Sequence, residues 1–339
     1  MKIVFFGTPQ FAVPSLKRLI ADSTFDIAAV VTQPDKRRGR GGNVTPSPVK
    51  AAALALDCPI WQPARIKKDP ETLQALSQLE ADAFVVIAYG QILSQDILDM
   101  PRLGCVNAHG SLLPQYRGAA PIQWSLYHGE HETGITTMKM DAGMDTGPML
   151  EREAVPISLL DNAWTLAETL AALSADLLVS TLLKLSEQMI RPIPQDDDKA
   201  TYAPLIQKAD YQLDWHRPAL ALHNQIRGFY PNCITTLRQQ PLKVIATLPW
   251  DDNSSPPPLA DIYPLLSEVI AKADHDTAPG TVVGVLKAHG PVVSTGQGYL
   301  LLREVKPAGK KAQNGWDFAN GTRLALGERF GPDDSDQTS

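Results

Sequence analysis

Apolar runs and helical patterns alternate along the chain from residue 2 to residue 140, and this alternation limits the possible folds more than any other feature. It is typical of a parallel β-sheet with helices on both faces, an α/β architecture of the Rossmann-like type. We expect strands at 2–7, 26–33, 83–89, 105–108 and 134–140, and helices at 11–21, 48–56 and 70–79.

Parallel sheets bind ligands at the carboxyl ends of their strands. The segments 7–9, 89–91, 107–114 and 141–147 follow expected strands, so we expect them to face one crevice. The segment after the first strand has Gly7 but lacks the second and third glycines of a dinucleotide fingerprint, and no Gly-Lys-Ser/Thr sequence indicates a phosphate loop. Hydride transfer and ATP chemistry are therefore disfavoured.

Asn107 and His109 are two residues apart at the end of an expected strand, so their side chains project from the same face. An amide that donates to a developing oxyanion and an imidazole that moves a proton are the groups that acyl transfer requires, without a metal. The alternative is an ordinary polar strand end. The turn at 111–114 and Asp145, in a glycine-bracketed loop, favour a site in which the Asp145 carboxylate orients His109.

The segment 33–48 is a basic loop with four cations, Lys36, Arg37, Arg38 and Arg40, and a single acid. Its glycines and prolines lead us to expect no regular element. A local positive charge does nothing for the solubility of a chain with net charge −6. It suggests instead a polyanionic substrate, although a solvated surface loop is the alternative.

The chain is 339 residues long, which suits two domains. A helical pattern over 163–188 is followed by an extended acidic stretch, and then by short strands at 233–237, 242–247, 280–285, 290–294 and 298–302 that are typical of a small β-barrel. We expect a catalytic domain at 1–189, a linker at 190–205, a second domain at 206–328 and an acidic tail at 329–339. The stretch 251–278 is long for a hairpin.

A second basic cluster, Arg303, Lys306, Lys310 and Lys311, follows the last expected strand of the barrel. Such barrels bind single-stranded nucleic acid in positive grooves, so these residues are candidate contacts for a nucleic-acid backbone, with a solvated face as the alternative. We expect Trp316 and Phe318 in the core. The three widely spaced cysteines fit neither a disulfide framework nor a zinc site. The apolar opening is too short to span a bilayer, so we expect a cytosolic protein.

The residues Asn107-Ala108-His109, the turn Ser111-Leu112-Leu113-Pro114 and Asp145 in Asp-x-Gly-x-Asp-Thr-Gly resemble the site of the 10-formyltetrahydrofolate-dependent formyltransferases. The resemblance runs from Lys2 to about Gly327. It implies a catalytic triad of Asn107, His109 and Asp145, a formyl donor in 10-formyltetrahydrofolate, and an OB-like second domain. Along the whole chain the likeness is to members that formylate initiator methionyl-tRNA, and it suggests a monomer.

The same resemblance implies the ligand contacts. Folate would meet Ala88, Tyr89, Gly90, Gln91, Ile92, Leu93, Ser111, Leu112, Leu113, Pro114, Asp141 and Gly143. Thr8 and Phe11 would border the methionyl amine and side chain, and an arginine placed like Arg40 would grip the acceptor end of the tRNA. For Phe11, an ordinary core residue at a helix start is an equal alternative.

Two rival functions share some of these features. A sister formyltransferase that acts on a small amine, such as a nucleotide sugar, would share the triad but would not need the basic loop or the second domain. A non-catalytic tRNA-binding protein with a degenerate site is the other rival, and the intact triad argues against it.

Overall fold

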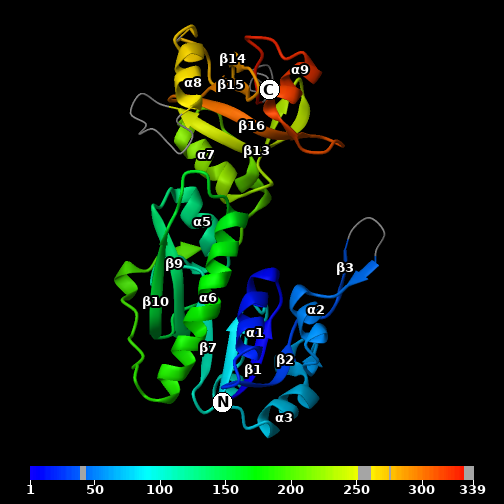
Figure 1. Cartoon of the computed structure of the whole chain (residues 1–339), viewed down its shortest axis with the longest axis vertical. Helices are drawn as coiled ribbons and strands as arrows, with labels where there is room; N and C mark the ends of the chain where they lie inside the picture. Colours follow the sequence, from blue (N-terminus) through cyan, green and yellow to red (C-terminus); the bar gives the residue numbers. More distant parts are fainter. Residues whose placement is uncertain (39–42, 251–260, 275, 332–339) are drawn as a thin grey trace, which may run out of the picture. The chain divides into compact units, whose positions relative to one another are not determined.

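The computed structural model describes residues 1–38, 43–250, 261–274 and 276–331 (Figure 1). The chain forms two compact units, which we describe separately. Unit 1 comprises Met1–Pro121, Glu132–Pro156 and Ala167–Pro204, and unit 2 comprises Ile122–His131, Ile157–Leu166 and Leu205–Ser339.

A seven-stranded sheet of strand order β10-β9-β7-β6-β1-β2-β5 forms the centre of unit 1. The strands are β1 (Lys2–Gly7), β2 (Asp26–Val31), β5 (Ile60–Trp61), β6 (Ala83–Ile87), β7 (Cys105–His109), β9 (Glu132–Lys139) and β10 (Met149–Pro156). The five from β5 to β7 in this order are parallel, and all of them except β5 were predicted. The expected strand at 134–140 is present as β9, but it runs antiparallel to β7 and forms a hairpin with β10. Burial periodicity gives a strand's position and not its direction, so the sequence pattern could not show this.

Helices of unit 1 begin where capping residues satisfy their first amides. The Ser47 hydroxyl accepts from the Lys50 amide at the start of α2 (Pro48–Ala55), and the Asp69 carboxylate accepts from the Thr72 amide at the start of α3 (Pro70–Gln78). The predicted helix at 11–21 is a 3₁₀ turn (Gln10–Ala12) followed by α1 (Val13–Ile20). The short helix α4 (Gln95–Leu98) also belongs to unit 1, whereas α5 (Pro121–His128) belongs to unit 2 from Ile122 onward. All three predicted helices are therefore present.

Helix α6 (Ala163–Ser186) is 24 residues long, as the helical pattern predicted to within two residues at its end. By length and composition it could cross a membrane, but 56% of its most apolar stretch is buried in the structure. A buried core helix passes the same test. Inside unit 1 it packs near α1, where the Ser15 and Ser174 hydroxyls lie 3.3 Å apart.

The basic loop contains a regular element that the sequence did not suggest. Strands β3 (Lys36–Arg38) and β4 (Asn43–Thr45) pair antiparallel, with Lys36 opposite Thr45. The expectation of no regular element was wrong here, because the glycines lie between the two strands and leave both free to pair. Arg40 lies outside the described residues.

Unit 2 is built on an antiparallel sheet of order β12-β13-β16-β15-β14. Its strands are β12 (Ile234–Leu237), β13 (Gln240–Trp250), β14 (Val282–Leu286), β15 (Gly290–Ser294), β16 (Tyr299–Pro307) and the short β17 (Gln313–Asn314), which pairs with β16. The five predicted strands are confirmed. A closed barrel is not established: among the described residues, β12 and β14 do not pair directly. Isolated bridges join Phe330 to Leu237 and Arg329 to Thr281.

Helices α7 (Ala219–Gly228), α8 (Ile262–Ile270) and α9 (Gly315–Thr322) also belong to unit 2. Helix α8 lies within the long stretch 251–278, and its Leu266 is buried with Leu286 and Leu301 in one apolar cluster. Part of that stretch is therefore an element with its own core.

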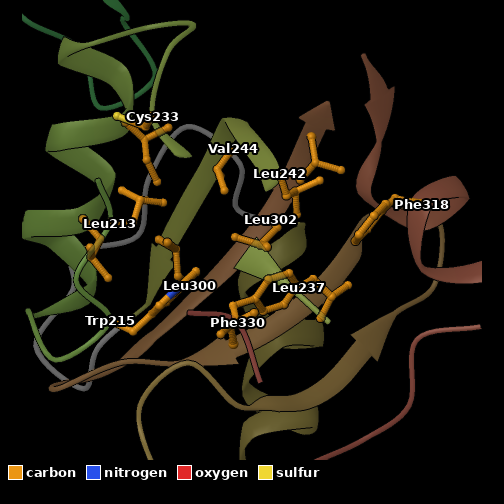
Figure 2. Packing of buried hydrophobic residues seen from close by; sticks show 14 of the residues in the cluster. Leu213, Trp215, Cys233, Leu237, Leu242, Val244, Leu300, Leu302, Phe318 and Phe330 are labelled. Atoms are coloured by element: carbon orange, nitrogen blue, oxygen red, sulfur yellow. The ribbon is translucent and has the colours of Figure 1, made fainter. Parts of the chain in front are cut away.

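The main core of unit 2 consists of aromatic and aliphatic side chains from its strands, its helices and the segments that connect them (Figure 2). Trp215 packs against Phe330 with ring centroids 5.7 Å apart, and its indole N–H donates to the Thr235 hydroxyl at 3.0 Å. Phe318 is buried here, as predicted, whereas Trp316 is only partly buried. Burial raises the pKa of Cys233, also in this core, to about 12, which makes it an inert thiol at neutral pH.

His223 of α7 is a buried neutral imidazole. Its Nε2 lies 2.8 Å from the carbonyl oxygen of Leu159, which can only accept, so Nε2 donates. Its Nδ1 lies 2.9 Å from the Thr247 hydroxyl and accepts from it. Both ring nitrogens are thus satisfied without a charge. Burial, together with the charges of the nearby Arg227 and Arg303, lowers the pKa of His223 from 6.5 to about 4, although the hydrogen bond to the Leu159 carbonyl acts in the opposite direction.

This imidazole predicts how stability depends on pH. The unfolded chain binds a proton at this histidine below its ordinary pKa of 6.5, and the folded chain does so only near 4. Stability is therefore lost as pH falls through this window, by on the order of 3 kcal/mol. Urea unfolding at pH 7 and pH 4.5 should show a smaller loss for His223→Gln than for the native chain. The same loss in both proteins would contradict the assignment.

Candidate active site

Asn107 and His109 lie on β7 between β6 and β9, with Asn107 opposite Val86 on one side and Met138 on the other. The Asp145 carboxylate reaches both. Its Oδ1 is 3.5 Å from Asn107 Nδ2, and its Oδ2 is 3.6 Å from His109 Nδ1. The structure therefore brings together the three residues that the sequence singled out.

The backbone carbonyl of Tyr116 fixes the state of His109. Its oxygen lies 2.8 Å from His109 Nε2, and because a carbonyl only accepts, Nε2 must carry a proton. Nδ1, which faces Asp145, is then protonated only when the ring is charged. Tyr116 has a left-handed backbone with φ of 60°, which an amide hydrogen bond to the Thr201 hydroxyl supports. The imidazole is 6% exposed, so this geometry is well enclosed.

Asp145 is held by the backbone on several sides. Its Oδ2 accepts from the Gly118 amide at 2.9 Å, and its own carbonyl accepts from Gln195 Nε2 at 2.8 Å. Its φ is 54°, again in the left-handed region. The same Gln195 amide donates to the Gly147 carbonyl at 2.7 Å, so one side chain grips the loop at two points.

Arg117 completes this support. Its Nε donates to Gln195 Oε1 at 2.9 Å, and one of its terminal amino groups pairs with Asp197 at 2.7 Å. Short strands β8 (Arg117–Gly118) and β11 (Tyr202–Ala203) pair in parallel beside it. Sequence reasoning missed Arg117 and Gln195. Arg117 directly continues the 111–114 turn, which was a usable signal, but nothing local marks Gln195.

The loop at 141–147 reaches the site by a different route from the one expected. We expected it at the carboxyl end of a parallel strand. Since β9 is antiparallel, its last residue, Lys139, pairs with Val106 near the start of β7. The loop then folds back, and the Asp145 carboxylate reaches Asn107 and His109 on β7. Asp141 stabilises the turn by accepting from the Gly143 amide and the Thr146 hydroxyl.

The predicted folate-contacting residues divide by exposure. Tyr89, Leu93, Ser111 and Leu113 are buried, so they can offer a ligand little beyond backbone atoms. The exposed members are Ala88, Gly90, Ile92, Asp141 and Gly143, and Gln91, Leu112 and Pro114 are intermediate. Ile92 is 77% exposed, which is unusual for an isoleucine and leaves an apolar side chain available to a flat ring.

The predicted methionyl-tRNA residues are placed as follows. The Thr8 hydroxyl donates to the Tyr89 carbonyl at 2.8 Å, which brings the ends of β1 and β6 together. Phe11 is half-buried, and Lys36 is exposed. Arg37 and Arg38 belong to β3. In unit 2, Lys306, Lys310 and Lys311 are exposed, whereas Arg303 lines a hollow. Among the described residues, no group of three or more His, Cys, Asp or Glu could hold a metal ion.

Comparison with known proteins identifies the family. Residues 1–182 match the family model described as formyl transferase, and residues 205–323 match the model described as formyl transferase, C-terminal domain. A methionyl-tRNA formyltransferase from Trichormus variabilis is 62% identical over 333 residues, covering 98% of this chain and 99% of that protein. One from Trichodesmium erythraeum is 60% identical over 334 residues, covering 97% of this chain and 98% of that protein.

A solved structure shares the fold. The sugar 3N-formyl transferase WlaRD, in the presence of dTdp and 5-N-formyl-THF, superposes with a TM-score of 0.63 at 17% sequence identity. The match covers 92% of this chain and 99% of that chain. At this identity the likeness concerns the architecture alone.

Gly147 offers a test of how tightly the Asp145 loop is held. A Cβ atom at this position would clash with the carbonyl oxygen of Lys139, which belongs to β9 and cannot easily move. We expect Gly147→Ala to lower the free energy of unfolding by about 1 to 3 kcal/mol and to speed hydrogen exchange of the Gly118 amide. Gly321→Ala is the control, because no atom lies within 4 Å of its added Cβ. Unchanged exchange at Gly118 would mean that the loop tolerates the clash without moving Asp145.

Proposed function

The chain belongs to the formyl transferase family, and we propose that it transfers the formyl group of 10-formyltetrahydrofolate to the α-amino group of initiator methionyl-tRNA. The observation that carries this proposal is the 62% identity to a methionyl-tRNA formyltransferase along almost the whole chain. The convergence of Asn107, His109 and Asp145 supplies the chemistry. The product, N-formylmethionyl-tRNA, serves translation initiation.

The proposed mechanism assigns one task to each side chain. The α-amine has an ordinary pKa of about 7.7 to 8.0 and needs little activation to attack the formyl carbon. Asn107 Nδ2 donates to the oxyanion that develops, since its contact with Asp145 is long enough to be given up. His109 supports that charge or passes a proton from Nδ1 to N10 as the bond between the formyl carbon and N10 breaks. The proton that the attacking amine releases then replaces the one that His109 gave up. Asp145 orients the ring, directly or through a water molecule.

The folate and tRNA sites extend this proposal. Folate would lie against the exposed backbone of Ala88 and Gly90 and the loop around Asp141, with Ser111–Pro114 shaping its approach. The β3–β4 hairpin with Arg40, and the cations at the end of β16, would contact tRNA. A catalytic domain at 1–189 and a tRNA-binding domain at 206–328, in a monomeric cytosolic protein, fit this division of tasks.

An OB-like barrel in unit 2 is part of the same proposal. The bridges from Arg329 and Phe330 to the segments beside β14 and β12 support it, because this strip of chain spans the gap between the two edge strands. The small-amine rival, by contrast, has no specific observation in its favour.

The first prediction concerns chemistry. Asn107→Ala, His109→Ala and Asp145→Asn should each lower kcat, by about 10²- to 10³-fold for the loss of the oxyanion donor Asn107, while tRNA affinity stays near the native value. Labelled 10-formyltetrahydrofolate and charged initiator tRNA give the rate of formylmethionine formation. Asp198→Asn, a change of an exposed acid, is the control. Native turnover in His109→Ala would remove that residue from the mechanism, and a native chain that forms no formylmethionine would overturn the proposed function.

The second prediction separates tRNA delivery from chemistry. Neutralising Lys36 and Arg40 to Gln should weaken tRNA use and reduce the slope of log kcat/KM against log salt by about one for each phosphate that the variant no longer neutralises. Folate affinity, measured by direct titration, should not change. The double variant Lys17→Gln/Lys287→Gln removes two exposed cations elsewhere and provides the matched loss of charge. An unchanged salt slope in the Lys36/Arg40 variant would favour the small-amine reading.

A further inference from the structure

Unit 2 contains a hollow of about 310 Å³, a volume that includes its open mouth. Its lining combines cationic, polar and apolar side chains: Leu160, Asn162, His223, Ile226, Arg227, Ile245, Ala246, Thr247 and Arg303. The hollow contains no residue of the Asn107–His109–Asp145 site, and among the residues that the structure describes no carboxylate lines it. Two guanidinium groups therefore line the hollow, and no described Asp or Glu lines it with them.

Arg303 has no structural task that explains its position. Its partly buried side chain makes no hydrogen bond and no ion pair with any described residue. Irregular pairing of β13 with β16 surrounds it: Ala246 pairs with Glu304 and Thr247 with Leu302, with a register shift on each side of Ala246. Such bulges re-aim side chains. Here the bulge leaves Arg303 without a partner residue across the strands and turned to the hollow.

Arg227 of α7 is 7% exposed, and its fixed bonds go to neutral acceptors. Its Nε donates to Asn224 Oδ1 at 2.9 Å, and one terminal amino group donates to the Ser158 carbonyl at 2.9 Å and to that of Asp161 at 3.5 Å. The Asp161 carboxylate acts on it only from a distance that forms no ion pair. Burial lowers the pKa of Arg227 to about 10, which leaves it charged at neutral pH.

His223 adds no charge to the hollow, because both its nitrogens are committed to neutral partners. The net charge facing the hollow is therefore close to +2. Two like charges in a partly dry site repel each other, and a buried cation without an anion is costly. A tetrahedral dianion or monoanion with several acceptor oxygens would relieve both costs, and guanidinium groups bind phosphate through paired N–H donors.

We propose that this hollow in unit 2, lined by Arg227 and Arg303, binds a phosphate group. The group belongs either to a nucleic-acid backbone or to a small phosphorylated molecule. The nucleic-acid alternative rests on the proposed function, which already assigns the cations at the end of β16 to tRNA, whereas the small-molecule alternative does not.

The test uses the full chain without folate or methionine. Arg303→Gln is the main variant, since this side chain makes no bond on which folding depends, and Arg303→Lys keeps the charge but removes the paired donors. Lys287→Gln, an exposed cation, is the matched control. Inorganic phosphate is titrated by calorimetry, and the affinity for uncharged tRNA is measured as a function of salt.

We expect Arg303→Gln to raise the Kd for inorganic phosphate at least 10-fold, or to reduce the salt slope of tRNA binding by about one, with Lys287→Gln unchanged in the affected measurement. A change in the tRNA slope, with or without a change in phosphate affinity, identifies a nucleic-acid phosphate as the ligand. A change in phosphate affinity alone identifies a small phosphorylated molecule. If Arg303→Gln matches the native chain in both measurements, the proposal is wrong, whether or not the chain transfers formyl groups.

Discussion

The hydrogen bond from His109 Nε2 to the Tyr116 carbonyl determines what the candidate site can do. It commits one ring nitrogen to donation and leaves Nδ1 as the nitrogen whose proton can come and go beside Asp145. The support for this bond comes from distant parts of unit 1. Thr201 holds the Tyr116 backbone, and Gln195 holds the loop that carries Asp145. A proton-transferring imidazole thus depends on a chain segment some eighty residues further along.

Much of the fold and the centre of the site could be predicted from the sequence because they follow from local patterns. Apolar periodicity located five strands of each sheet but not β5 or β10, and the spacing of Asn107 and His109 placed them on one face. Strand direction was not predictable in this way, so β9 was expected to be parallel and is antiparallel to β7. The role of Gln195 was not predictable either. Its side chain donates to two loop carbonyls about fifty residues away in the sequence, and such contacts leave no local sequence pattern. A segment predicted to be a linker therefore supports the candidate site.

The hollow in unit 2 illustrates the same limit. The charge of Arg303 was visible in the sequence, and it was grouped with the neighbouring lysines as a solvated basic cluster or a tRNA contact. Its surroundings were not visible, because they follow from a bulge in the pairing of β13 with β16 and from the position of Arg227 on α7. The three lysines are exposed, but Arg303 is partly buried beside a second guanidinium. The four cations therefore lie in two different environments.

The most direct test of the role assigned to His109 is a nitrogen-15 NMR titration of its imidazole in the native chain. We predict that Nε2 keeps its proton throughout the titration, because it donates to the Tyr116 carbonyl, and that only Nδ1 changes its protonation. A neutral ring that carries its proton on Nδ1 and leaves Nε2 bare would contradict this role, since His109 could not then take up a proton at the nitrogen that faces Asp145.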